Sequence, residues 1–182
     1  MKQALLIIDI QNDYFEGGTM TLVNPDKACE NAKLILEKFR KENLEIIHIQ
    51  HIATRPNATF FLPDTFGAQI HENVLPKGNE KVIIKHFPNS FRETGLLNYL
   101  NENKITDLVI CGMMTHMCID ATTRAAKDYG YNCTLIDDAC ATRNLTINQE
   151  SVNANEVHNA FLAALNSTYA TIKNTTEFCQ NS

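Results

Sequence analysis

Several features that mark specialised classes of protein are missing from this sequence. No apolar stretch approaches the 18 or more residues of a membrane-spanning helix. No run of five or six like charges and no basic stripe occurs, and the formal net charge is −5, from 16 basic and 21 acidic residues. Nucleic acids and anionic membranes are therefore poor candidate partners, and we expect neither.

The six cysteines include no CxxC pair, which argues against a zinc ribbon and against a thioredoxin-type redox site. The chain begins Met1-Lys2-Gln3 and continues with a short apolar run that becomes acidic at Asp9. That apolar run is too short for a secretory signal peptide. We therefore expect a cytoplasmic protein whose thiols stay reduced.

Internal repeats and low-complexity segments are also absent, and 182 residues fit one domain, 1–182, better than two. Hydrophobic residues make up 44% of the chain, which is enough for a substantial core. A folded chain of this length buries roughly 70% of the surface that it exposes when unfolded.

Short apolar runs alternate with longer patterns of helical period along the chain. The apolar runs predict buried strands, the last of them at an edge, over residues 4–8, 44–49, 82–84, 108–110, 133–136 and 169–172. The helical patterns predict one helix opened by Asn24-Pro25-Asp26 and others over residues 93–100, 116–129 and 151–165. This alternation predicts βαβ units with right-handed crossovers and a parallel sheet.

Ligands of open α/β sheets bind beyond the carboxyl ends of the strands, so the polar residues that follow the apolar runs are the candidates for chemistry. Asp9 follows the first run, where a carboxylate is either a general acid or base with a perturbed pKa or a structural cap of the next loop. Lys85 follows the third run. Most lysines are solvated, but one at this end of a buried strand can lower the pKa of a thiol or hold a carboxylate.

Cys118 follows the fourth run, between a predicted strand and a predicted helix. If the helix begins near His116, the thiol lies in its first turn, where free N–H groups and the helix dipole favour a thiolate. The same N–H groups can hold an oxyanion. The alternative is that Cys118 is a small buried hydrophobic residue, as most free cysteines are.

The histidines give weaker signals. His48 and His51 are three residues apart on or near a strand, so their side chains are expected on opposite faces, which argues against joint binding of a metal. His116 precedes Cys118 by two residues and is not expected to face it on a helix.

Three motifs in order resemble the isochorismatase-like cysteine hydrolase family. An apolar strand ends in Asp-x-Gln-x-Asp at residues 9–13, a strand-end lysine follows at Lys85, and Gly-x-x-Thr-x-x-Cys precedes a helix at residues 112–118. Ser90-Phe91 and Thr122-Thr123-Arg124-Ala125-Ala126 also look like the family's pattern, and the resemblance extends over roughly residues 3–172.

The resemblance implies a three-layer α/β/α sandwich with a six-stranded parallel sheet, and usually a homodimer or homotetramer. It implies that Cys118 attacks, Asp9 moves the proton and Lys85 supports the charge. It further implies a cis peptide bond between Met113 and Met114 and an oxyanion hole formed by the amides of Met114 and Cys118.

For the pocket we expect a small-molecule substrate near aromatic residues at the strand ends. We assign substrate binding to Gln11, Phe15, His51, Phe87 and Thr115. Phe60, Phe61, Phe66 and Phe91 are further candidates, although Phe91 is expected in the core. The segment 54–66, which contains Pro56 and Pro63, is expected to be a loop of the kind that carries specificity.

The nicotinamidase branch of the family carries an Asp-x-His metal motif after the second strand, where this chain reads Gln50-His51-Ile52-Ala53. We therefore expect no metal and no cofactor. The expected function is hydrolysis of a small amide-type C–N bond through a thioester. The alternatives are vinyl ether hydrolysis of the isochorismatase type by Asp9 and Lys85, a non-catalytic α/β binding protein, and a metal amidase with ligands such as His51 and His71.

Overall fold

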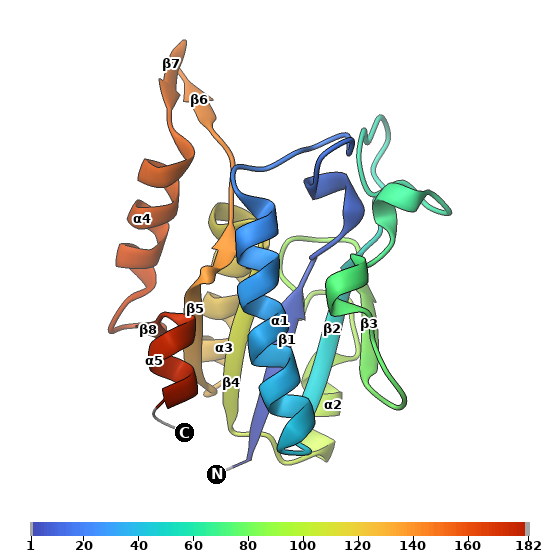
Figure 1. Cartoon of the computed structure of the whole chain (residues 1–182), viewed down its shortest axis with the longest axis vertical. Helices are drawn as coiled ribbons and strands as arrows, with labels where there is room; N and C mark the ends of the chain where they lie inside the picture. The colour runs from blue at the N-terminus through green and yellow to red at the C-terminus, as the bar shows by residue number, and fades with distance from the viewer. Residues whose placement is uncertain (1, 181–182) are drawn as a thin grey trace.

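A parallel sheet of six strands forms the middle layer of the computed structural model, which describes residues 2–180 (Figure 1). Its order is β3-β2-β1-β4-β5-β8, and every neighbouring pair is parallel. The strands are β1 (Gln3–Ile8), β2 (Glu45–His51), β3 (Lys81–Lys85), β4 (Asp107–Met113), β5 (Asn132–Ala141) and β8 (Thr171–Lys173). The predicted fold class, a three-layer α/β/α sandwich with a six-stranded parallel sheet, is confirmed.

Helices cover both faces of the sheet. One face carries α1 (Pro25–Lys41) and α5 (Thr175–Gln180), and the other carries α2 (Leu96–Glu102), α3 (Asp120–Asp128) and α4 (Ala154–Leu165). Residues of β1 alternate between the two cores, with Leu5 and Ile7 on the α1 side and Leu6 and Ile8 on the α2 side. Because both sides of the strand are buried, its sequence is apolar throughout rather than alternating.

Within residues 2–180, no helix combines the length and the apolar character that crossing a membrane requires.

The sequence patterns missed the smaller elements and some boundaries. The predicted helix 116–129 consists of a π-helical turn, η4 (Thr115–Ile119), followed by α3. The predicted helix 151–165 begins only at Ala154, because Asn153 and Glu156 form a capping box there. The residues before it form a hairpin of β6 (Leu145–Ile147) and β7 (Glu150–Val152). The helix predicted over 93–100 also begins later, at Leu96, and α5 was not predicted.

Three short 3-10 turns lie in the loops that follow β1 and β2. They are η1 (Asn12–Tyr14), η2 (Phe66–Ala68) and η3 (Glu72–Val74). The segment 54–66 is a loop, as predicted, apart from the residue that opens η2. Asp13 of η1 ties this loop to the segment that follows β1, because its carboxylate accepts hydrogen bonds from the Phe61 amide (2.6 Å) and from Thr19.

A glycine allows β4 and β1 to approach closely where both strands end. Gly112 pairs with Ile8 and has a φ of 130°, in the left-handed half of backbone space. A Cβ atom built on Gly112 would lie 1.9 Å from the Ile8 carbonyl oxygen. Asp9 follows Ile8 directly, so this contact sets the distance between the first strand end and the segment that carries Cys118.

Replacing Gly112 by alanine should therefore destabilise the protein more than a positive φ alone explains. The unfavourable φ costs about 1–3 kcal/mol, and the clash with the Ile8 carbonyl adds to it. Gly130→Ala is the matched control, because Gly130 also has a positive φ (92°) but has no atom within 4 Å of the added Cβ. Urea unfolding of both variants measures the difference, and equal losses of stability would contradict this role for Gly112.

Candidate active site

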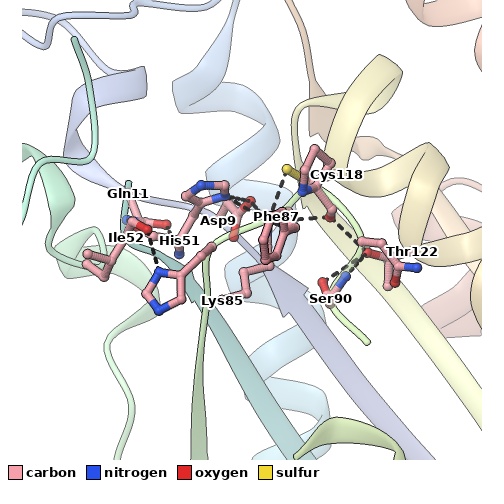
Figure 2. A network of polar contacts seen from close by, with 12 residues as sticks. Asp9, Gln11, His51, Ile52, Lys85, Phe87, Ser90, Cys118 and Thr122 are labelled. Atoms are coloured by element: carbon pink, nitrogen blue, oxygen red, sulfur yellow. Dashed lines mark hydrogen bonds and ion pairs between the residues drawn. The ribbon is translucent and has the colours of Figure 1, made fainter. Parts of the chain in front are cut away.

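Three residues that are far apart in the sequence meet at the carboxyl edge of the sheet (Figure 2). Asp9 follows β1, Lys85 is the last residue of β3, and Cys118 lies in η4 after β4. Asp9 and Lys85 are 0% exposed and Cys118 is 4% exposed. The backbone of Asp9 is left-handed (φ 52°), a conformation that aspartate tolerates better than most residues. The convergence predicted from the strand ends is therefore present.

The ammonium group of Lys85 lies at the centre of this cluster. Its Nζ is 2.6 Å from Oδ2 of Asp9, 3.1 Å from Sγ of Cys118 and 3.1 Å from Nδ1 of His51. It also donates to the carbonyl oxygens of Phe87 (3.1 Å) and Pro88 (3.4 Å). Burial alone would lower the pKa of Lys85, but the charges of Asp9 and Cys118 outweigh it and raise that pKa above its ordinary value. Lys85 is therefore a permanent cation at neutral pH.

The surroundings of the Cys118 thiol favour its protonated form. Burial raises its pKa, the neighbouring Asp9 carboxylate raises it further, and Lys85 only partly opposes them. The start of a helix was expected to favour a thiolate, but burial and the Asp9 carboxylate act on the pKa of this thiol in the opposite direction. A carboxylate oxygen of Asp9 lies within 4.8 Å of Sγ of Cys118, and Asp9 is therefore placed to accept the proton of the thiol.

Asp9, His51 and Cys118 have ligand atoms within 4.8 Å of one another, and this is the one group with metal-ligand spacing among residues 2–180. Lys85 contacts all three of them. The ammonium group therefore already occupies the position in which these electron-pair donors would bind a metal cation. The donor set does not fit a metal, because a divalent cation beside the buried Lys85 ammonium would be strongly repelled.

His51, the last residue of β2, is held from both sides. Gln11 accepts a hydrogen bond from the His51 amide (2.8 Å) and donates to the carbonyl oxygens of His51 (2.8 Å) and Ala68 (2.7 Å). Lys85 can only donate, so Nδ1 of His51 accepts and the ring proton lies on Nε2. Burial lowers the pKa of His51 to about 4, so the ring is neutral.

A pocket of about 380 Å³ opens beside Cys118. Its walls are largely apolar and aromatic. The residues that line it are Tyr14, His51, Ala53, Thr54, Arg55, Phe60, His86, Phe87, Pro88, Met114, Met117 and Cys118. Of the residues assigned to substrate binding from the sequence, the structure thus brings His51 and Phe87 to the pocket.

The other three assigned residues lie elsewhere. The polar atoms of Gln11 are used by backbone groups, and its side chain is fully buried. Phe15 stacks on His71, with ring centroids 3.9 Å apart. The hydroxyl of Thr115 bonds the Ala141 carbonyl (3.3 Å) and His158 (2.9 Å), which fixes η4. These three side chains support the site, and none of them lines the pocket.

Among the remaining aromatic candidates, only Phe60 lines the pocket. Phe61 is fully buried behind it, against Tyr14, whereas Phe66 is 75% exposed. Phe91 packs in the core against Tyr129 and Tyr131, as expected. Tyr14 was missed in the sequence, because the turn η1 directs Tyr14 rather than its neighbour Phe15 to the pocket.

The segment around the nucleophile has two further features. The peptide bond between Met113 and Met114 is cis. The carbonyl oxygen of Met114 accepts hydrogen bonds from the amides of Met117 (3.0 Å) and Ile119 (3.3 Å), which shapes the turn that carries Cys118. Outside the regular helices and strands of the described chain, no backbone hydrogen bond has the Met114 or the Cys118 amide as donor.

A buried pair of hydroxyl groups joins the loop after Lys85 to the helix after Cys118. The hydroxyl of Thr122, one turn beyond Cys118, accepts from the Ser90 amide (3.0 Å) and bonds the Ser90 hydroxyl (2.9 Å). Thr122 also lies 3.4 Å from the Pro88 carbonyl, the same oxygen that Lys85 contacts. Through this connection, the two motifs that contain Ser90 and Thr122 hold the loop of Lys85 in position against the helix that follows Cys118 (Figure 2).

The electrostatics predict how the reactivity of Cys118 depends on its neighbours. Since Asp9 raises the pKa of the thiol and Lys85 lowers it, Asp9→Asn should make Cys118 react at lower pH and Lys85→Met at higher pH. The rate of alkylation by iodoacetamide, followed on the Cys118 peptide by mass spectrometry across pH, measures both shifts. Cys133, buried away from the cluster, provides the internal control. Shifts in the same direction for both variants would contradict the assignment.

The hydroxyl pair predicts a second pH-profile effect. Thr122→Val keeps the shape of the side chain but removes its hydrogen bonds to Ser90, at a cost of about 1–3 kcal/mol for the unsatisfied partners. Loosening the loop moves Lys85 away from the thiol, so the alkylation profile of Cys118 should shift to higher pH. Thr122→Ser restores the hydroxyl and should restore the profile. A loss of stability without any shift in the profile would reduce Thr122 to a purely structural role.

Comparisons with known proteins agree with this architecture. The isochorismatase domain model matches residues 3–176. The Bacillus subtilis isochorismatase family protein YddQ is 52% identical over 178 residues, covering 98% of this chain and 99% of that protein. A streptothricin hydrolase of Streptomyces noursei is 31% identical over 77% of this chain and 50% of its own length.

Among solved structures, an isochorismatase hydrolase relative from Oleispira antarctica superposes with a TM-score of 0.95 at 45% identity, covering 99% of this chain and 97% of that one. The family model matches nearly the whole described chain, and it agrees with the relative at 52% identity and the solved structure at 45% identity on one assignment. The protein is a hydrolase of the isochorismatase family.

Proposed function

We propose that this hydrolase cleaves a small amide-type C–N bond through a thioester formed on Cys118. The observation that carries the proposal is the placement of the Lys85 ammonium between the Asp9 carboxylate (2.6 Å) and the Cys118 thiol (3.1 Å), beside an open pocket. A nucleophile, a proton acceptor and a fixed positive charge are the groups that acyl transfer requires.

In the first half of the proposed reaction, Asp9 accepts the thiol proton as Sγ of Cys118 attacks the carbonyl carbon. The negative charge then moves from sulfur to the carbonyl oxygen, where the amides of Met114 and Cys118 donate to it. Asp9 returns the proton to the nitrogen as the C–N bond breaks, and ammonia or an amine leaves. The raised pKa of the Cys118 thiol fits this order, in which the proton leaves only when substrate is bound.

In the second half, Asp9 accepts a proton from water while the water oxygen attacks the thioester. The C–S bond breaks, the carboxylic acid leaves, and Asp9 gives the proton back to sulfur. Lys85 keeps its protons throughout and stabilises both the ionised Asp9 and the thiolate. The oxyanion donors contribute about 10²–10³-fold each in comparable enzymes.

Two other functions compete with this proposal. In vinyl ether hydrolysis, Asp9 and Lys85 act while Cys118 is a bystander. In a non-catalytic binding protein, the cluster is kept for structure alone. The Asp9 carboxylate lies within 4.8 Å of the Cys118 thiol, and this placement, which neither alternative uses, favours the amidase.

We also propose that the chain works in the cytoplasm as a homodimer or homotetramer on a small-molecule substrate. The described cysteines are all free, which fits a reducing compartment.

Release of ammonia or amine from a panel of small amides and ureides tests the proposed reaction. We expect turnover by the wild type and a loss of at least about 10³-fold in Cys118→Ala, as for removal of other covalent nucleophiles. Cys179→Ala, in α5 away from the cluster, is the matched control and should keep full activity. Full activity of Cys118→Ala on the amides that the wild type hydrolyses would overturn the proposal.

A further inference from the structure

Resting on the proposed amidase activity, we propose that the substrate is a small amide that also carries a carboxylate group, and that Arg55 at the pocket binds that carboxylate. The charge that faces the pocket, that of Arg55, points to this class of substrate.

The lining of the pocket is positively charged. Among its described residues, Arg55 is a cation and His51 is neutral, and there is no aspartate or glutamate. Asp9 lies behind the lining, with its charge compensated by Lys85 at 2.6 Å. His86 bonds the Ile52 carbonyl through Nδ1 (2.7 Å), so that nitrogen is already occupied. The uncompensated charge in contact with a bound substrate is therefore the guanidinium of Arg55.

Arg55 also differs from the other arginines of the described chain. Arg40 pairs with Glu37 and Glu80, Arg92 with Glu93, and Arg124 with Asp120, while Arg143 donates to the Asn144 carbonyl. Within residues 2–180, the side chain of Arg55 makes no ion pair and no hydrogen bond. The chain has 21 acidic residues, yet none of those described forms an ion pair with this arginine. Its planar fork of donors is thus free to bind a carboxylate in bidentate fashion.

The loop that carries Arg55 is anchored next to the reacting groups. The Ala53 amide donates to the Phe61 carbonyl (2.8 Å), and the Phe61 amide donates to Asp13 (2.6 Å). The charge of Arg55 reaches into the site, since it contributes to lowering the pKa of His51. Arg55 is therefore held where it can interact with one end of a substrate whose other end lies at Cys118.

His51 supplies a second, uncharged donor. Its Nδ1 accepts from Lys85, so its proton lies on Nε2, and Nε2 has no hydrogen-bond partner among the described residues. Tyr14, Phe60 and Phe87 provide apolar walls between these polar groups. At about 380 Å³, the pocket lies at the small end of ligand sites. A short aliphatic or single-ring amide with a terminal carboxylate matches the volume, the apolar walls and the charge.

Matched pairs of amides test the inference. Succinamate, glutaramate and terephthalamate carry a carboxylate, and butanamide, pentanamide and benzamide are their neutral counterparts. The readout is the concentration of each compound that protects Cys118 from alkylation by iodoacetamide, which needs binding but no turnover. Where turnover occurs, kcat and KM are measured for the same pairs.

For at least one pair, we expect the carboxylate member to protect the wild type at concentrations at least about 10-fold lower than its neutral counterpart, as for a charge-assisted bidentate pair. Arg55→Gln should remove that preference by raising KM for the carboxylate amide, with little effect on kcat or on the neutral amide. Arg55→Glu should reverse the preference. Arg55 is exposed, so these changes should not affect folding. Arg124→Gln, which removes the same charge from α3, is the control and should behave as the wild type.

Equal protection by both members of every pair, or no protection by any of the compounds, would overturn the inference. So would a preference that survives in Arg55→Gln. Failure of the proposed function gives a different result: carboxylate amides would protect Cys118 in an Arg55-dependent way, but no compound would be hydrolysed. The two proposals can therefore fail separately.

Discussion

The site depends on one buried ammonium group. Lys85 is completely inaccessible to solvent, and its Nζ contacts a carboxylate, a thiol and an imidazole nitrogen that belong to three other segments of the chain. A buried charge is tolerated only when it is paired and hydrogen-bonded. Here the pairing also organises the site, because each partner of Lys85 is fixed in position, protonation state or both. Asp9 is held beside the thiol, and His51 is restricted to the tautomer that has its proton on Nε2.

The fold explains how a charge can be placed there. In a parallel sheet with helices on both faces, the strands are apolar along their length and their carboxyl ends open onto a common edge. Gly112 brings β4 against β1 at that edge, and Thr122 and Ser90 join the Lys85 loop to the helix after Cys118. Gln11 holds the end of β2. The reacting groups are thus supported by residues that do not line the pocket.

Much of this arrangement could be predicted from the sequence. Long apolar runs identify strands buried on both faces, and the first polar residues after them must lie at the same edge, which is sufficient to bring Asp9, Lys85 and Cys118 together. The pocket was harder to predict, because its walls come from loops. Phe15 and Tyr14 are neighbours, and only the geometry of the turn η1 decides which of them lines the pocket. Gln11 belongs to a family motif, but the motif does not reveal that the side-chain amide of Gln11 forms its hydrogen bonds with backbone groups of His51 and Ala68.

The protonation state of Cys118 is a further limit of sequence reasoning. The start of a helix favours a thiolate, whereas the burial of the side chain, which no local pattern reveals, raises the pKa of the thiol. Arg55 lies in a loop without a distinctive pattern, and the role proposed for it depends on its lack of an ion pair within residues 2–180. Both features depend on long-range contacts and become visible only when the loops are placed around the strand ends.

Covalent catalysis by Cys118 is tested most directly by the mass of the Cys118 peptide after rapid acid quenching of the enzyme during turnover of an amide substrate. If a thioester forms on Cys118, this peptide gains the mass of the acyl group, and the adduct disappears with hydroxylamine. No other cysteine peptide should carry it. Steady turnover with an unmodified Cys118 peptide, continuing after Cys118 has been alkylated, would contradict covalent catalysis and favour a reaction carried out by Asp9 and Lys85 alone.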